Sequence, residues 1–203
     1  MVDSYQKLAS TVIINKKNRL ISYDESLNLI GAGRSAFVFK LKKTNKAMKV
    51  FFSNFEHLAK IEGEIYDALQ TIHYYPSVYK LGSNYIVMDY IDGQTLFECL
   101  TNGKLITSVH INEIDYALSL ASERGLNPSD IHLKNIIITS NGEIRIIDVA
   151  RFRQTKDCMQ WTHLKKSYHQ LYRKRFFPQK IPVFSLNILA FLYKKSLIPT
   201  YRG

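Results

Sequence analysis

The stretch SDIHLKNIIITSNGEIRIIDVARF, residues 129–152, constrains the fold more than any other part of the chain. Two isoleucine-rich runs flank Asn141-Gly142, a dipeptide typical of tight turns between antiparallel strands. The pattern predicts a β-hairpin. Because a hairpin brings its two ends to the same rim, we expect Asn135 and Asp148, which flank the strands, to lie close together.

Three polar residues mark the ends of this hairpin, although a plain hairpin does not require them. Asn135 and Asp148 offer the oxygen ligands that Mg²⁺ prefers, and we expect them to share a divalent ion. Asp130, one loop before the first strand, is placed to accept the proton of an attacking hydroxyl. The stretch therefore predicts a metal site beside a general base.

A glycine-containing loop, GAGRSAF, precedes two runs of alternating β-formers, Ala36–Leu41 and Ala47–Phe52, with a polar KKTNK turn between them. This pattern predicts a strand, a loop and a hairpin. Glycines let a backbone approach phosphates closely and turn its N–H groups toward them. A simple turn is the alternative, because a G-x-G sequence alone is weakly specific.

The next segment, NFEHLAKIEGEIYDALQTI, predicts a helix from the spacing of Leu58, Ile61, Ile65 and Leu69, capped by Ser53 or Asn54. Glu62 would lie on the face that packs on the sheet. Lys49, in AMKVF, would point to the side of the glycine loop, where an ion pair with Glu62 could fix it on nucleotide phosphates. Glu64 is the alternative partner, and ordinary surface charge is the alternative interpretation of both residues.

The rest of the chain alternates between strand and helix patterns. SVYKLGSNYIVMDYIDG predicts two strands, and HINEIDYALSLASERGL a helix that Gly125 ends. QWTHLKKSYHQLYRKRFF predicts an amphipathic basic helix. VFSLNILAFLYKK is apolar nearly all round, which predicts a buried helix in the second half of the protein. The first 25 residues are expected to add a strand through TVIIN or to pack behind the first half.

Composition indicates a globular chain of 203 residues with 46% hydrophobic residues, enough for one domain or two small lobes. The apolar run 181–193 falls short of the ~20 residues of a membrane-spanning helix. The N-terminus has no basic-then-apolar signal pattern, so we expect no export. Cys99 and Cys158 lack metal-binding spacing, and together with the missing signal they predict reduced thiols in the cytoplasm.

Charge is distributed unevenly along the chain. Residues 1–150 contain 16 Lys and Arg against 16 Asp and Glu, whereas residues 151–203 contain 12 against Asp157 alone, so the net charge of +11 arises in the last quarter. This asymmetry favours an anionic partner there: RNA or another nucleic acid, a phosphorylated ligand, or an acidic or membrane surface. A solubilising helical face is the alternative.

In order and spacing, these motifs resemble those of protein kinases from about Leu27 to Phe152. That family combines a Gly-rich loop, a strand Lys paired with a helix Glu, a catalytic-loop Asp followed by Asn, and a metal-binding Asp in D-F-G. They appear here as GAGRSAFVF, AMKVF, KIEGE, SDIHLKN and IIDVA, while YIVMDYIDGQTL is similar to the gatekeeper and hinge, with Met88 as gatekeeper.

The resemblance implies an α+β, two-lobed kinase-like fold, with a small β-sheet N-lobe plus one helix and a reduced, mainly helical C-lobe. Residues 1–92 would form the N-terminal extension and N-lobe, and 93–203 the C-lobe. It implies ATP and Mg²⁺ as cofactors, Asp130, Lys49 and Glu62 as catalytic residues, and Asn135 and Asp148 as metal ligands. The implied nucleotide contacts are Gly31, Ala32, Gly33, Arg34, Ser35, Ala36, Val38, Lys49, Met88, Asp89, Tyr90 and Ile91.

Departures from the usual pattern point to a minimal, atypical kinase. The third loop glycine is Ala36, Pro128-Ser129 replaces the catalytic-loop His-Arg, and DVA replaces D-F-G. In this the chain is similar to the RIO kinases, the kinase of the KEOPS complex and small bacterial proteins described as serine/threonine kinases. With about 50 residues after the last motif, it offers little room for a small-molecule pocket, so a protein substrate or autophosphorylation is favoured.

Other functions stay open at this point. DIHLKN resembles the catalytic loop of aminoglycoside, choline and lipopolysaccharide-core kinases, in which His132 would shape the loop or touch phosphate, so a small-molecule or glycolipid kinase is one alternative. A structural His132 is the simpler interpretation. Ala36 and DVA also fit a nucleotide-binding pseudokinase scaffold, and the basic tail fits a nucleic-acid-associated module.

Overall fold

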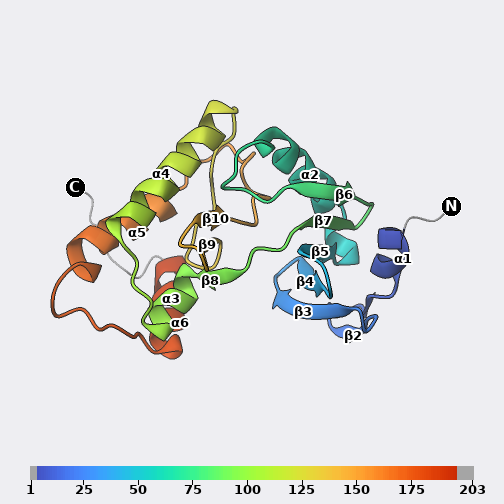
Figure 1. The fold of residues 1–203 in the computed structure, drawn as a ribbon, viewed down its shortest axis with the longest axis horizontal. Helices are drawn as coiled ribbons and strands as arrows, with labels where there is room; N and C mark the ends of the chain where they lie inside the picture. Colours follow the sequence, from blue (N-terminus) through green and yellow to red (C-terminus); the bar gives the residue numbers. More distant parts are fainter. Residues whose placement is uncertain (1–3, 196–203) are drawn as a thin grey trace.

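A five-stranded antiparallel sheet forms most of the first half of the protein in a computed structural model, which describes residues 4–195 (Figure 1). Its order is β3-β4-β5-β7-β6, from β3 Leu27–Ala32, β4 Ala36–Leu41, β5 Lys46–Phe51, β6 Val78–Leu81 and β7 Tyr85–Asp89. The predicted strands are present, and β5 begins one residue earlier than expected. Val38 pairs with Lys49 across β4 and β5, and Lys49 with Ile86 across β5 and β7.

One face of this sheet is covered by α2, His57–Leu69, as the apolar spacing predicts. The predicted cap is wrong, because Ser53 and Asn54 lie in the 3-10 turn Ser53–Phe55 and the N-cap residue Glu56 makes no side-chain cap. The predicted face packs on the apolar core, with Ile65 and Leu69 buried and Leu58 and Ile61 partly buried against it. Gly63 faces β6 so closely that a Cβ there would lie 2.9 Å from the Leu81 side chain.

The N-terminal segment covers the opposite face of the sheet. It contains α1 Ser4–Ser10, β1 Ile13–Ile14 and β2 Leu20–Ser22, and β1 pairs with β2 in a small sheet of their own. Ala9 and Val12 belong to one apolar cluster with Phe39 and Val87 of the large sheet. The TVIIN segment therefore pairs as a strand, though outside the main sheet, and the extension packs behind it.

A second antiparallel sheet, of order β10-β9-β8, forms the centre of the other half. Its strands are β8 Gly93–Thr95, β9 Ile136–Thr139 and β10 Ile144–Ile146. The predicted hairpin joins β9 to β10, and Gly142 adopts φ +84° in the turn, a conformation that favours glycine. A single apolar cluster runs from α2 to this sheet and includes Ile65, Ile138 and Phe152.

Two helices flank the second sheet, α3 Leu96–Asn102 and α4 Ser108–Glu123, each opened by a capping box, Thr95 with Glu98 and Thr107 with His110. The α4 helix matches the prediction, and Gly125 follows its end at φ +74°. The architecture is the predicted α+β fold with a small sheet half and a second half richer in helix. We propose a lobe boundary at residue 92, because β7 and β8 belong to different sheets.

The C-terminal region departs from the sequence-based expectations. The basic helix begins as expected in α5, Gln160–Ser167, but ends in a π-helical turn at Tyr172. The last helix, α6 Val183–Lys194, was predicted to be buried, and this is wrong, because Phe184 is 66% and Phe191 58% exposed. It lies beside α3, linked by the Ile181 N–H to the Leu100 carbonyl at 2.9 Å, and contacts the rest of the protein on one side only.

Membrane-spanning helices are not found between residues 4 and 195, where every helix is too short or too polar to cross a bilayer.

The central position of α2 leads to a stability prediction. Ile65 is fully buried in the larger apolar cluster, so Ile65→Ala should reduce the free energy of unfolding by about 2–5 kcal/mol in urea titrations, through lost contacts and a residual cavity. Lys60→Ala, on the exposed side of the same helix, is the matched control and should stay within about 0.5 kcal/mol of the wild type. Equal losses in the two variants would contradict this packing.

Candidate active site

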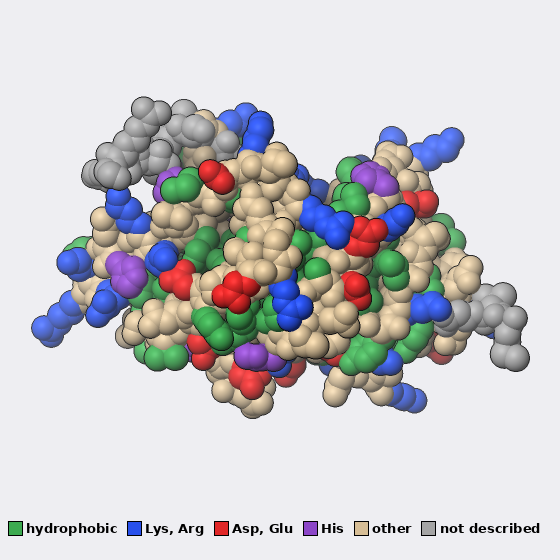
Figure 2. Space-filling model, turned by 90° about the horizontal axis from the view of Figure 1, so that it is seen from above, with side chains coloured by type: hydrophobic (Ala, Val, Ile, Leu, Met, Phe, Trp, Pro, Cys, Tyr) green, Lys and Arg blue, Asp and Glu red, His purple; other side chains and the backbone are tan. Residues whose placement is uncertain are grey.

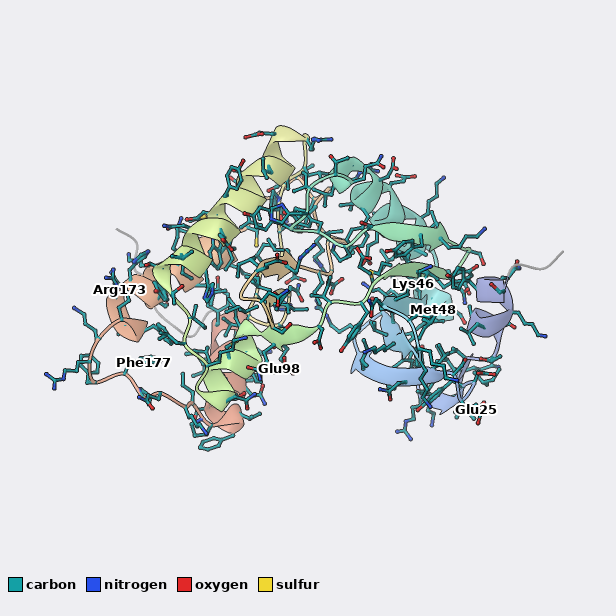
Figure 3. The ribbon with its side chains drawn as sticks, viewed as in Figure 1. Glu25, Lys46, Met48, Glu98, Arg173 and Phe177 are labelled. Carbon is teal, nitrogen blue, oxygen red and sulfur yellow. The ribbon has the colours of Figure 1, made fainter. Side chains whose placement is uncertain are left out.

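A buried ammonium group, that of Lys49, joins three distant parts of the chain. Its Nζ lies 2.7 Å from Glu62 Oε2, 2.9 Å from Glu62 Oε1 and 2.9 Å from Asp148 Oδ1. Lys49 follows Met48 on β5 (Figure 3), Glu62 is on α2, and Asp148 follows β10. The Lys49 and Glu62 side chains are only 8% and 0% exposed, whereas Asp148 is 52% exposed. The predicted Lys, Glu and metal-binding Asp are therefore in one cluster.

The charges in this cluster shift one another's pKa values. Burial lowers the pKa of Lys49, but the carboxylates of Glu62 and Asp148 outweigh burial and raise it above its ordinary value. Burial raises the pKa of Glu62 while the Lys49 charge opposes this rise. Burial alone would raise the pKa of Asp148, but the Lys49 charge has the larger opposite effect, so the pKa is lowered. Lys49 is thus cationic and Asp148 anionic at neutral pH.

Tyr66 supports Asp148 from α2. Asp148 adopts φ +60°, a left-handed conformation that is strained for a residue other than glycine. Its N–H donates to the Tyr66 hydroxyl at 3.3 Å, and burial raises the pKa of Tyr66. Tyr66 was not among the predicted site residues. Its place four residues after Glu62 on the buried face of α2 is the signal that could have found it.

Asn135 lies at the same rim as Asp148. Its carbonyl accepts the Ile147 N–H at 2.9 Å, and its side-chain Nδ2 donates to the Asp130 carbonyl at 3.0 Å. Because Nδ2 is engaged, Oδ1 is the atom left to accept a ligand. The structure thus brings together the two predicted metal ligands, as the hairpin argument requires. His132 shapes this loop, since its Nδ1 accepts the Lys134 N–H at 3.3 Å.

Asp130 is held between two arginines. Its Oδ2 lies 3.4 Å from Arg34 of the glycine loop and 3.5 Å from Arg151. Like Asp148, it adopts φ +60°, and its N–H donates to the Cys158 Sγ at 3.4 Å. Strained backbone costs roughly 1–3 kcal/mol and concentrates at functional sites. The two predicted site aspartates share this conformation with Asn18, Lys43 and Thr71, which lie outside the site.

The glycine loop occupies the turn between β3 and β4. Gly31 and Gly33 have no positive φ, and a Cβ at either would meet only ordinary van der Waals contacts. Gly31 follows an irregularity in the register between β3 and β4, and at Gly33 the absence of a Cβ leaves room for a ligand to approach the backbone. The Gly33 N–H donates to the Ala36 carbonyl, whereas within residues 4–195 the N–H groups of Arg34 and Ser35 have no protein partner.

The predicted hinge follows β7. Met88, the predicted gatekeeper, is buried and pairs with Ala47. The Asp89 and Tyr90 N–H groups donate to the Ser77 and Asn45 carbonyls, at 3.0 and 2.9 Å. The Ile91 N–H has no partner in the described part of the chain. Of the three predicted hinge residues, Ile91 is therefore the one with a donor available to a ligand.

The surface is notched between the two halves, and side chains of both charges gather beside the notch (Figure 2). A separate hollow of about 520 Å³ lies between α1 and the β6–β7 turn, lined by Gln6, Ala9, Ser10 and residues 80–85. It contains none of the predicted site residues. The candidate site is therefore defined by its charged and polar side chains and does not coincide with this hollow.

The donors present fit a magnesium ion that shares its ligands with a nucleotide. Residues 4–195 contain no group of three or more His, Cys, Asp or Glu side chains that could hold a metal alone. Asn135 and Asp148 supply two oxygen donors, because Asp148 Oδ1 is bonded to Lys49 and Oδ2 is left. Mg²⁺ is commonly bound by one or two carboxylates together with substrate phosphates and water.

Proteins named as serine/threonine-protein kinases are similar to this chain in sequence. The chain is 48% identical over 200 residues to a Bacillus subtilis protein named "Putative serine/threonine-protein kinase YrzF", covering 96% of this chain and 93% of that one. It is 26% identical over 164 residues to "Probable serine/threonine-protein kinase PknB" of Lactococcus lactis, covering 70% of this chain and 26% of that longer protein. No protein-family model matches the chain. The chain belongs to the serine/threonine-protein kinase family.

This kinase contains two further ion pairs that the sequence patterns did not indicate. Glu64, the alternative partner for Lys49, instead contacts Arg153 at 2.5 Å, and Arg151 contacts Asp130. Arg151 directly follows the DVA sequence, and Arg153 comes two residues later. Their closeness to Asp148 along the chain was a usable signal, although their partners are 21 or more residues away in sequence and only the fold brings them together.

Removing the Lys49 ammonium should make the stability of the kinase depend on pH. In Lys49→Met, Glu62 stays buried without the cation that opposes the effect of burial, so its pKa rises further. A carboxyl with a raised folded-state pKa contributes stability below its unfolded value of about 4.3, and this stability is lost as pH rises. Urea unfolding should show a loss of about 3–5 kcal/mol at pH 8 and a smaller loss at pH 5.

The control for this experiment is the double variant Lys49→Met with Glu62→Gln, which has no buried carboxyl to titrate. Its unfolding free energy should therefore fall less between pH 5 and pH 8 than that of Lys49→Met. If Lys49→Met alone followed the wild type in parallel, Glu62 would not depend on Lys49 for its charge.

Proposed function

We propose that this protein transfers the γ-phosphate of Mg-ATP to a serine or threonine hydroxyl. The observation that carries the proposal is the contact of Lys49 with both Glu62 and Asp148. It combines, in one cluster, a cation for nucleotide phosphates, a carboxylate that orients it, and a carboxylate for a metal ion. Membership of the serine/threonine-protein kinase family supports the same reaction.

Nucleotide binding in this proposal uses both sides of the site. Lys49 would hold the α and β phosphates, oriented by Glu62. The unpartnered N–H groups of Arg34 and Ser35 would donate to phosphate oxygens, as backbone amides of glycine loops do. The Ile91 N–H would donate to the adenine base beside Met88. These assignments agree with where the free donors of the described structure lie.

The metal and the acceptor would meet at the hairpin rim. Asn135 Oδ1 and Asp148 would hold Mg²⁺, which when bound neutralises charge on the phosphates. Asp130 would orient the acceptor hydroxyl or take its proton. Arg34, whose side chain is 72% exposed, can exchange the Asp130 carboxylate for phosphate oxygens as the nucleotide binds. Catalysis would rest on positioning and on fixed charges.

We further propose that the kinase is of an atypical type, akin to the RIO and KEOPS kinases, that acts on a protein or on itself. Pro128-Ser129 leaves no cation directly before Asp130 to receive a phosphorylated loop. The Glu64–Arg153 ion pair instead connects α2 to the segment after Asp148 without phosphorylation. An anionic partner at the basic C-terminal region is part of this proposal.

The first test removes each proposed carboxylate. Asp148→Ala and Asp130→Ala should each lower ATP turnover by about 100-fold or more, since each removes a group that acts on the transferred phosphate or its acceptor. Asp67→Ala, an exposed carboxylate on α2, is the matched control and should retain wild-type turnover. Wild-type rates in Asp148→Ala, with circular dichroism unchanged, would refute the assignment.

Mg²⁺ dependence distinguishes a kinase from a nucleotide-binding scaffold. ATP with Mg²⁺ should raise the melting temperature of the wild type more than ATP with EDTA, because the ion links the nucleotide to Asn135 and Asp148. Asp148→Ala should lose the difference between the two conditions. Labelled ATP should also mark serine or threonine in the protein itself or in added lysate, and a Mg-dependent shift without any transfer would indicate a pseudokinase.

A further inference from the structure

The last helix presents a continuous apolar stripe to solvent. Phe184, Ile188 and Phe191 recur at i, i+4 and i+7 on α6 and are 66%, 54% and 58% exposed. Val183 and Leu189 are also more than half exposed, whereas Leu186 on the opposite side is buried. Soluble proteins seldom expose such a contiguous apolar stripe unless something binds it.

The sequence on both sides of this stripe is basic. Between Cys158 and Lys195 the sequence has no Asp or Glu. The segment between the π-helical turn and α6 lies at the end of the molecule away from the N-terminal half, where Arg173 and Phe177 are labelled in Figure 3. The exposed basic residues of the segment before α6 are Arg173, Lys174, Arg175 and Lys180, and the exposed Lys195 directly follows the helix.

Lys195 connects the charge to the apolar stripe. It follows Phe191 by four residues, so it continues the same side of the helix, and its Nζ lies 6.0 Å from the Phe191 ring centroid. Phe176 lies in the basic segment before α6, and its aromatic side chain is 79% exposed. Cations thus lie before and after the apolar helix in the sequence, at residues 173–180 and at Lys195.

We propose that α6 and the basic segment before it bind the surface of an anionic lipid bilayer. A 12-residue helix cannot span a bilayer, which takes about 20 residues, but it can lie in the interface with its apolar face among the acyl chains. Such helices combine an apolar face with Lys and Arg that contact anionic headgroups. This combination is what residues 173–195 supply.

The charge pattern argues against two other occupants. A second copy of this chain would bring an equally positive segment against the first, and like charges in contact oppose association. A nucleic acid would satisfy the cations, but Ile188 and Leu189 have no role in contacting phosphates, and its bases stack on aromatic rather than aliphatic side chains. An anionic bilayer would contact the cations through its headgroups and the aliphatic side chains through its acyl chains.

Binding through α6 would leave the candidate active site free. The described contacts of Lys49, Asp130 and Asp148 involve no residue of α6. The helix is joined to α3 and α5 instead, through the Ile181 N–H and through the Tyr193 hydroxyl, 2.8 Å from His163 Nδ1. Binding through α6 would therefore hold the protein at a membrane and leave its candidate active site accessible.

Co-sedimentation with vesicles tests the proposal on the full chain. Vesicles of phosphatidylcholine with about one-third phosphatidylglycerol should bind the wild type, and vesicles of phosphatidylcholine alone should bind it at least about tenfold more weakly. Phe184→Ser with Phe191→Ser keeps every charge and should reduce binding to the anionic vesicles by about tenfold or more. Ile13→Ser with Ile21→Ser, exposed apolar residues of β1 and β2, is the matched control and should bind as the wild type does.

Three results would overturn the proposal. Binding that Phe184→Ser with Phe191→Ser leaves unchanged would assign the attraction to charge alone. A wild-type dimer that the same double variant dissociates, without vesicle binding, would assign the stripe to a second copy. Tighter binding to single-stranded RNA than to anionic vesicles would assign the region to nucleic acid. Unchanged circular dichroism and ATP turnover in the double variant establish that the fold is intact, so the test stands apart from that of phosphate transfer.

Discussion

The Lys49 ammonium, removed from water and held by two carboxylates, is the interaction on which the rest of the structure depends. A buried cation of this kind is tolerable only if its partners are fixed within hydrogen-bonding distance. Glu62 meets this requirement from α2 and Asp148 from the loop after β10. The cluster therefore links α2, the large sheet and the loop after β10, and the surrounding apolar side chains bury Lys49 and Glu62, while Asp148 stays half-exposed.

Much of the fold could be predicted because it is specified locally. The alternation in residues 36–41, the Asn141-Gly142 turn and the apolar spacing of residues 108–123 each identify one element without knowledge of its neighbours. The candidate site could be predicted from the order of its motifs, since Asp130, Asn135 and Asp148 flank a hairpin whose geometry brings the ends together. The elements needed only the period of the pattern and the turn chemistry, whereas the roles of Lys49, Glu62 and Asp130 are those that the resemblance to protein kinases implies.

What the sequence could not provide depends on contacts between distant segments. Ser53 does not cap α2 because Phe52 and Phe55 pack on each other across a 3-10 turn, with ring centroids 6.4 Å apart. The apolar composition of α6 predicts a buried helix. The local sequence pattern does not show that the neighbouring elements cover only one side of it. The partners of Arg34, Arg151 and Arg153 likewise depend on how the loops are arranged in space.

Glu62 and Glu64 lie two residues apart on α2 and so point in different directions from its axis. One is bound through Lys49 to Asp148, and the other is bound directly to Arg153 of the segment that follows Asp148. A rotation of α2 about its axis would stretch both connections at once, and a shift of that segment would do the same. The orientation of α2 and the position of Asp148 are therefore linked through two contacts, one buried at Lys49 and one at the surface.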